Sequence, residues 1–241
     1  MNEMVKRTIV LGAHPRGNVG DAICSELEER QQSWVVSDPT QEELDVTNRQ
    51  QMVDYDWTAN SLVYCPGYCD PDWLHEQTWG DIEAQVGVTL TGALQATRLF
   101  ISDNFAEMKA RETPDQTRLR KRVVIIGSRA AETPHRCQAP YNAAKAGLRM
   151  MVSTLAREYH AVGFRFFLIE PGAISGTPYS ERVRDAAERI FGPESAVEMG
   201  ERGTFGRNIE PGEVADLVAT ILSGRYDWLA GAPIPFSGGP Q

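Results

Sequence analysis

The sequence lacks the long apolar runs and the basic excess that mark several classes of protein. No stretch of its 241 residues approaches the ~20 apolar residues of a membrane-spanning helix. The first residues, Met1 to Arg7, are polar and charged, so we expect no secretory signal. A net charge of −9 argues against a nucleic-acid partner, which would need a basic surface. We therefore expect a cytoplasmic protein with neither a membrane nor a nucleic-acid partner.

Cysteine is scarce, and the four present do not form a metal-binding pattern. They are Cys24, Cys65, Cys69 and Cys137. Cys65 and Cys69, or Cys137 with His135, could suggest a metal, but neither pair has a second pair at zinc-site spacing. We expect no metal ion and reduced thiols. The sequence shows no repeat, low-complexity segment or linker, so we expect a single domain over residues 1–241.

Short apolar runs alternate with helical patterns along the chain. The runs predict buried strands at Thr8–Leu11, Trp34–Ser37, Ser61–Tyr64, Val123–Ile126, Phe164–Ile169 and Trp228–Phe236. Helical patterns cover Asp21–Arg30, Asp81–Phe105, Ala143–Tyr159 and Pro211–Leu222. This alternation predicts an α/β fold with a Rossmann-like, doubly wound parallel sheet in three layers. Residues 174–208 are polar with short helical patches and predict a mobile flap over a pocket.

A glycine-rich turn follows the first predicted strand. Gly12, Gly17 and Gly20 stand between that strand and a segment of helical composition. Strand, glycine turn and helix together present backbone N–H groups to a pyrophosphate, so we expect a dinucleotide site here. Asp38, at the end of the second strand, can hydrogen-bond the adenosine ribose hydroxyls of NAD. The alternative is an Asp-Pro turn with Pro39.

The candidate chemistry centres on Tyr141 and Lys145, with Ser128 upstream. On a helix, residues i and i+4 share a face, so the ammonium would lie near the phenol. A free phenol titrates at about 10, and a nearby positive charge lowers that pKa. A shift of about three units needs roughly 4 kcal/mol. The spacing therefore predicts that Tyr141 exchanges a proton with a carbonyl or hydroxyl, unless the pair is an ordinary helical Tyr and Lys.

Taken in order, these motifs resemble the short-chain dehydrogenase/reductase superfamily along nearly the whole chain. Other matching segments are Leu44-Asp45-Val46, Cys65-Pro66-Gly67 in place of Asn-Ala-Gly, Thr89-Leu90-Thr91-Gly92 and Pro171-Gly172. The resemblance implies reversible hydride transfer between a nicotinamide and a carbonyl/alcohol pair. It implies that Tyr141 exchanges the proton and that Lys145 lowers its pKa and holds the nicotinamide ribose. Ser128 would hydrogen-bond the substrate oxygen.

The resemblance also implies where the cofactor binds and how copies of the chain assemble. The implied cofactor residues are Gly12, His14, Arg16, Gly17, Asn18, Val19, Gly20, Asp38, Asp45, Val46, Cys65, Pro66, Gly67, Tyr141, Lys145, Pro171, Gly172 and Ile174. The family commonly pairs its two long helices, so we expect a homodimer or homotetramer.

Three departures from the family pattern stand out. The glycine turn is longer than usual and contains Pro15. Thr89 occupies the position of the family's active-site asparagine, whose backbone carbonyl holds a proton-relaying water; a threonine keeps that carbonyl. The region between the second and fourth strands of the family is trimmed, which should leave the adenine pocket more open.

Cofactor choice and substrate follow from fewer residues. Asp38 would repel a 2′-phosphate and favours NAD, whereas Arg16 could attract one and favours NADP; we favour NAD. We expect the pocket to be lined by Asp70, His135, Arg136, Cys137, Gln138, Tyr179 and Phe205. Arg136 could pair with a substrate carboxylate or phosphate, or form a surface ion pair.

Three other functions fit parts of the pattern. Enoyl reductases of the superfamily space their tyrosine and lysine more widely, and halohydrin dehalogenases have Arg where Lys145 stands. A non-catalytic, dinucleotide-sensing regulator would fit the unusual glycine turn and Thr89. The presence of Ser128, Tyr141 and Lys145 argues against it. We therefore expect an NAD(P)-dependent ketone/alcohol oxidoreductase.

Overall fold

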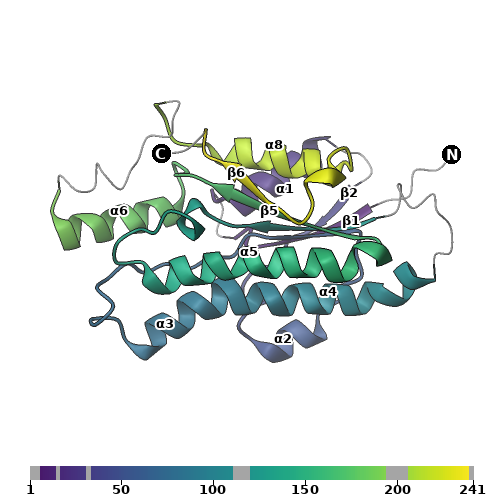
Figure 1. Cartoon of the computed structure of the whole chain (residues 1–241), viewed down its shortest axis with the longest axis horizontal. Coiled ribbons are helices and arrows are strands. Elements are labelled where there is room, and N and C mark those ends of the chain that lie inside the picture. The colour runs from purple at the N-terminus through teal and green to yellow at the C-terminus, as the bar shows by residue number, and fades with distance from the viewer. Residues whose placement is uncertain (1–5, 15–16, 31–33, 111–119, 194–205, 239–241) are drawn as a thin grey trace.

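Parallel strands form the centre of the molecule (Figure 1). The computed structural model describes residues 6–14, 17–30, 34–110, 120–193 and 206–238. Its six-stranded sheet has the order β2-β1-β3-β4-β5-β6. The strands are β1 (Lys6–Leu11), β2 (Trp34–Ser37), β3 (Ser61–Tyr64), β4 (Lys121–Ile126), β5 (Phe164–Pro171) and β6 (Pro233–Phe236). Strands β3 and β4 are buried along their whole length, as a sheet covered on both faces requires.

Helices cover both faces of this sheet (Figure 1). One face carries α1 (Val19–Arg30) and α8 (Pro211–Leu222), and the other carries α2 (Arg49–Asp54), α4 (Gly92–Lys109) and α5 (Ala139–Tyr159). Neighbouring residues of β1 point to opposite faces, so Ile9 packs in the core with Phe100 and Val10 packs in the core with Val218. The predicted three-layer, doubly wound α/β fold is confirmed.

The sheet order reverses between β1 and β3, where the chain runs out to β2 and then returns. Such a reversal opens a crevice at the carboxyl ends of the strands. Leu11, Tyr64, Ile126 and Pro171 end the four strands at this edge. Between β2 and β3 the structure has turns and the short helix α2 but no further strand. Strand β2 is therefore an edge strand, and Val35 on it is 51% exposed.

The bounds of one long helix and of the last strand differ from the sequence prediction. The helix expected over Asp81–Phe105 consists of α3 (Trp79–Val86), a π-helical turn (Gly87–Thr91) and α4. The strand expected from Trp228 begins only at Pro233, because residues 227–229 form a 3₁₀ turn.

The predicted flap contains a regular helix rather than short helical patches. In its described part, residues 174–193 and 206–208, the chain forms the 14-residue helix α6 (Pro178–Phe191). A capping box joins Thr177 and Ser180 at its start, and Pro178 occupies its first turn. This helix brings a new set of side chains to the carboxyl edge of the sheet.

Candidate active site

A cavity of about 670 Å³ opens at the carboxyl ends of the strands. The predicted site residues that line it are Gly12, His14, Asn18, Val19, Gly20, Asp45, Val46, Cys65, Pro66, Gly67, Ser128, Tyr141, Lys145, Pro171, Gly172 and Ile174. Gly17, Asp38 and Thr89 are not among the lining residues, and Arg16 lies outside the described residues. The fold therefore gathers most of the predicted site around one cavity, while the role of each residue stays a prediction.

The glycine turn brings backbone segments closer together than side chains at Gly12 and Gly20 would allow. Gly12 has φ of +80°, and a Cβ there would lie 2.9 Å from the backbone nitrogen of Pro66. A Cβ on Gly20 would overlap the carbonyl oxygen of Gly12. Gly17 has φ of +86° with open space around it. Since Asn18 lies at the N-terminus of α1, the turn delivers the chain to a helix end that favours phosphate oxygens.

Asp38 contacts a lining residue instead of lining the cavity itself. Its Oδ2 atom lies 3.5 Å from Nε2 of His14, and its side chain is 37% exposed. Asp45, by contrast, lines the cavity and accepts hydrogen bonds from the amide and hydroxyl of Thr47 at 2.8 and 2.7 Å. Two carboxylates therefore stand near the end of the cavity that the family pattern assigns to adenosine.

Tyr141, Lys145 and Ser128 converge at the ends of β4 and α5. Helix α5 begins at Ala139, so Tyr141 lies in its first turn and Lys145 follows one turn later. The Nζ atom of Lys145 donates to the carbonyl of Ile126 at 2.8 Å and lies 5.5 Å from the centroid of the Tyr141 ring. Ser128 caps a 3₁₀ turn, its Oγ accepting from the amide of Ala130 at 3.1 Å. The side chains of Lys145 and Ser128 are thus held by hydrogen bonds to the backbone around them.

The pKa of Tyr141 moves in the direction opposite to the sequence prediction. Burial raises it to about 12, and hydrogen bonds with Tyr179 and Ser128 oppose the rise only in part. Burial also lowers the pKa of Lys145 to about 8. The ammonium is held by the Ile126 carbonyl. The net shift of the Tyr141 pKa is therefore upward rather than the predicted lowering, because loss of solvent is its largest cause.

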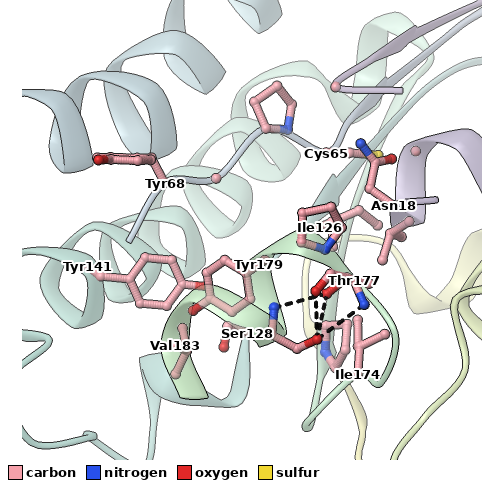
Figure 2. A pocket seen from close by; sticks show the side chains of 18 of the residues that line it. Asn18, Cys65, Tyr68, Ile126, Ser128, Tyr141, Ile174, Thr177, Tyr179 and Val183 are labelled. Carbon is pink, nitrogen blue, oxygen red and sulfur yellow. Dashed lines mark hydrogen bonds between the residues drawn. The ribbon is translucent and has the colours of Figure 1, made fainter. Parts of the chain in front are cut away.

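Helix α6 places a second tyrosine against the first (Figure 2). The rings of Tyr141 and Tyr179 lie 5.7 Å apart between centroids, at 34° to each other. Burial raises the pKa of Tyr179 well above its usual value. Tyr179 also hydrogen-bonds the buried thiol of Cys69. The predicted lining role of Tyr179 therefore has a definite geometry, with its ring packed on the candidate catalytic phenol.

Thr89 does not line the cavity, but it hydrogen-bonds a residue that does. Thr89 is fully buried inside the π-helical turn, and its Oγ1 accepts from the amide of Tyr68 at 3.2 Å. Tyr68 lines the cavity, although the sequence did not single it out. Turns of this kind are rare and occur frequently at functional sites.

Only part of the predicted substrate pocket lines the cavity. His135 and Gln138 do so, whereas Asp70 and Cys137 do not, and Phe205 lies outside the described residues. The cavity also receives Arg129, Thr177, Arg182 and Val183, which the sequence did not indicate. Three of these four belong to α6 and its cap, and the polar sequence of that segment gave no strong helix signal.

Arg136 forms no ion pair with another described residue and is not among the residues that line the cavity. Its guanidinium carbon lies 4.4 Å from the ring centroid of Phe191 and 5.6 Å from that of Trp73. In the described structure Arg136 makes a cation–π contact with Phe191 at the end of α6, and its predicted role as a substrate anion partner stays a prediction.

Comparison with known proteins identifies relatives of the chain. A family model described as "Enoyl-(Acyl carrier protein) reductase" matches residues 20–241. The vibriobactin-specific 2,3-dihydro-2,3-dihydroxybenzoate dehydrogenase of Vibrio cholerae is 30% identical over 166 residues, covering 67% of this chain and 58% of that protein. A probable 2,4-dienoyl-CoA reductase of Caenorhabditis elegans is 35% identical over 107 residues, 42% of this chain and 32% of that protein. The chain thus matches less than two thirds of the length of either relative.

A solved structure shares the fold over nearly the whole chain. The ligand-free aldohexose dehydrogenase of Thermoplasma acidophilum superposes with a TM-score of 0.79 at 22% identity, covering 98% of this chain and 94% of that one. The fold is of the Rossmann type, and its cavity lies at the carboxyl ends of the strands. The chain belongs to the short-chain dehydrogenase/reductase superfamily, whose members generally bind NAD or NADP. Among the described residues, no helix combines the length and apolar character needed to span a bilayer.

Proposed function

We propose that the protein is an NAD(P)-dependent oxidoreductase that interconverts a carbonyl and a secondary alcohol, with Tyr141 as the general acid and base. The observation that carries this proposal is the convergence of Tyr141, Ser128 and Lys145 in the cavity that also contains the glycine turn. The names of the two relatives, a dehydrogenase and a reductase, support a redox reaction in general.

The chain's own residues suit the binding of a dinucleotide. The glycine turn before α1, the turn at Cys65–Gly67 and the segment after β5 would hold it, and Lys145 would hold its nicotinamide ribose. When bound, this cofactor supplies or accepts the hydride. Asp38 favours NAD because a carboxylate repels a 2′-phosphate. Dissociation constants for NADH and NADPH measured by fluorescence titration test this choice, and tighter binding of NADPH would contradict it.

Proton exchange is the part of the reaction that the protein performs. The hydroxyls of Ser128 and Tyr141 would orient the substrate oxygen and stabilise charge that develops on it. With a pKa of about 12, the phenol of Tyr141 is protonated at neutral pH, as carbonyl reduction requires of a general acid. In the reverse direction the ammonium of Lys145 favours the phenolate that must form.

Turnover of NADH or NADPH with a panel of ketones, alcohols and enones tests the proposal. Tyr141→Phe should lower kcat by about 100-fold to 10,000-fold, the usual contribution of a general acid. Its cofactor affinity should stay within about twofold of the wild type, because the hydroxyl alone is removed. Tyr226→Phe is a matched control, since Tyr226 is 48% exposed and does not line the cavity.

Two other outcomes of this turnover assay would favour a different function. Cofactor binding without turnover of any compound in the panel would favour the dinucleotide-sensing alternative. Reduction of the enones at their carbon–carbon double bond alone would favour the reaction named in the matching family description.

We further propose that two copies pair through α4 and α5. A hollow of about 230 Å³ between these helices is lined by Leu94, Gln95, Thr97, Arg98, Ile101, Leu155 and Tyr159. Leu94 is 44% exposed there, so a charge at that position should oppose pairing. Light scattering of Leu94→Asp against the wild type measures this, and an unchanged mass would contradict it.

A further inference from the structure

The cavity differs in charge from the chain as a whole. The chain carries a net charge of −9. Among the described residues that line the cavity, Asp45 is the only acid, whereas Arg129, Lys145, Arg182 and Arg184 all line it. Asp45 lies at the end assigned to adenosine, and Lys145 is assigned to the cofactor ribose. Three arginines therefore line the cavity without an assigned role in cofactor binding.

The three arginines have different partners. Arg129 donates to the hydroxyls of Ser237 at 2.7 Å and Thr133 at 3.3 Å. Arg184 lies 3.3 Å from its neighbour Asp185. Arg182 instead lies over the ring of Tyr68, with its guanidinium carbon 5.2 Å from the centroid, and forms no ion pair with any described residue. Arg182 is thus the cavity arginine whose charge no carboxylate or hydroxyl of the described chain engages.

Helix α6 carries Arg182 toward the candidate catalytic centre. Tyr179 and Arg182 are three residues apart and share a face of the helix. Tyr179 packs on Tyr141, so Arg182 lies one turn, about 5 Å, further along the cavity wall. Burial raises the pKa of the nearby Cys69 thiol to about 12, and the charge of Arg182 acts against that rise. Arg182 is therefore close enough to act on a molecule held at Tyr141.

Tyr68 gives the guanidinium a fixed platform on the opposite side. Figure 2 shows Tyr68 across the cavity from Tyr141 and Tyr179. The amide of Tyr68 is tied to the buried hydroxyl of Thr89 at 3.2 Å. A guanidinium that stacks on an aromatic ring keeps its N–H edge free, and that edge matches the two oxygens of a carboxylate.

We propose that Arg182, which lies over the ring of Tyr68, binds a carboxylate of the substrate. The substrate is then a small carbonyl or alcohol compound whose carboxylate lies a few carbon atoms from the reacting carbon. The carbonyl/alcohol part of this inference rests on the proposed function, whereas the anion site does not.

Binding measurements test the anion site without any turnover. Cyclohexanecarboxylate and cyclohexanecarboxamide have the same ring and differ in charge, and their affinities for the protein–NADH complex can be compared by calorimetry at low ionic strength. The carboxylate should bind more tightly. Arg182→Gln should weaken its binding by about tenfold to a hundredfold, the contribution of a charged hydrogen bond, and change carboxamide binding by less than about twofold. Arg182→Lys should retain part of the preference as a point charge.

A matched control separates this effect from loss of net charge. Arg225→Gln makes the same charge change at an exposed residue that does not line the cavity, and it should leave both affinities unchanged. Equal binding of the two compounds to the wild type, or an unchanged preference in Arg182→Gln, would overturn the inference.

Turnover of a matched pair distinguishes this inference from the proposed function. With 4-oxocyclohexanecarboxylate, Arg182→Gln should raise KM about tenfold or more and leave kcat nearly unchanged, because the contact is made in the ground state as well. With the corresponding carboxamide, KM should not move. Equal KM values for the two ketones would overturn the inference while supporting the proposed function. Arg182-dependent carboxylate binding without turnover would remove the proposed function and leave the anion site.

Discussion

A buried ion pair joins the helix that carries Tyr141 to the strand that ends at the cavity. Arg149 of α5 donates from Nε and NH2 to the two carboxylate oxygens of Glu170, each at 2.6 Å. The Glu170 side chain is 2% exposed and the Arg149 side chain 28%. The hydrogen bonds of Glu170 raise the pKa of Arg149, so this guanidinium stays charged. Removing the guanidinium would leave a carboxylate buried without its partner, directly before Pro171.

We therefore expect Arg149→Met to lower the free energy of unfolding by about 3–5 kcal/mol, the cost of breaking a buried pair from one side. For a chain of this size the corresponding fall in Tm is roughly 6–20 °C. Urea and thermal denaturation measure both quantities. The double variant Arg149→Met/Glu170→Leu should recover much of the loss, since no buried charge is left unpaired.

Two results would refute this reasoning. A loss below about 1 kcal/mol in Arg149→Met would mean that the pair behaves like an exposed surface bridge. A double variant less stable than Arg149→Met would mean that the cost comes from lost packing rather than from the stranded charge. Arg225→Gln is a control for the loss of one surface charge and should unfold like the wild type.

Further predictions concern Lys145, Gly20 and Thr89. The pKa of Lys145 in the folded chain, about 8, lies below its ordinary 10.5, so the unfolded chain binds the proton more tightly. The free energy of unfolding should therefore fall by about 3 kcal/mol as pH falls from 10.5 to 8, and urea titrations of Lys145→Met should lack this slope. Gly20→Ala should weaken NADH binding by at least about tenfold in fluorescence titrations, since its Cβ overlaps backbone of the glycine turn; unchanged binding would contradict that packing. Thr89→Val removes the hydroxyl bonded to Tyr68 and should cost about 1 kcal/mol of stability by urea denaturation, which Thr89→Ser should largely restore.

The sheet and many of the residues that line the cavity were predictable because their signals are local. Each strand is a short apolar run closed by glycine, proline or aspartate, and parallel strands end at one edge. Gly12 and Cys65 follow the ends of two strands and Pro171 ends a third, so all three lie at the same edge of the sheet and line the cavity. Helix α8 was predicted at its observed bounds, because Pro211 and Glu213 mark its first turn.

The substrate end of the cavity was less predictable because it depends on tertiary contacts. Helix α6 is polar, buries little more than Ala186 and Ala187, and is fixed at its start by the capping box at Thr177. The sequence showed the charge of Lys145 but not the burial that raises the pKa of Tyr141. Burial is a property of the assembled cavity, so spacing alone gave the wrong direction of shift.

Thr89, which departs from the family pattern, is hydrogen-bonded to Tyr68 of the proposed anion site. The π-helical turn around Thr89 packs against the end of β3, where the Tyr64 hydroxyl bonds the carbonyl of Val88 at 2.5 Å. A Cβ on Gly92 would overlap that hydroxyl, so the turn and the strand end approach as closely as glycine permits. This contact sets the Thr89 side chain beside the loop that follows β3, where it holds the backbone of Tyr68. A residue that departs from the family pattern thus holds the backbone of Tyr68, the residue over whose ring Arg182 lies in the proposed anion site.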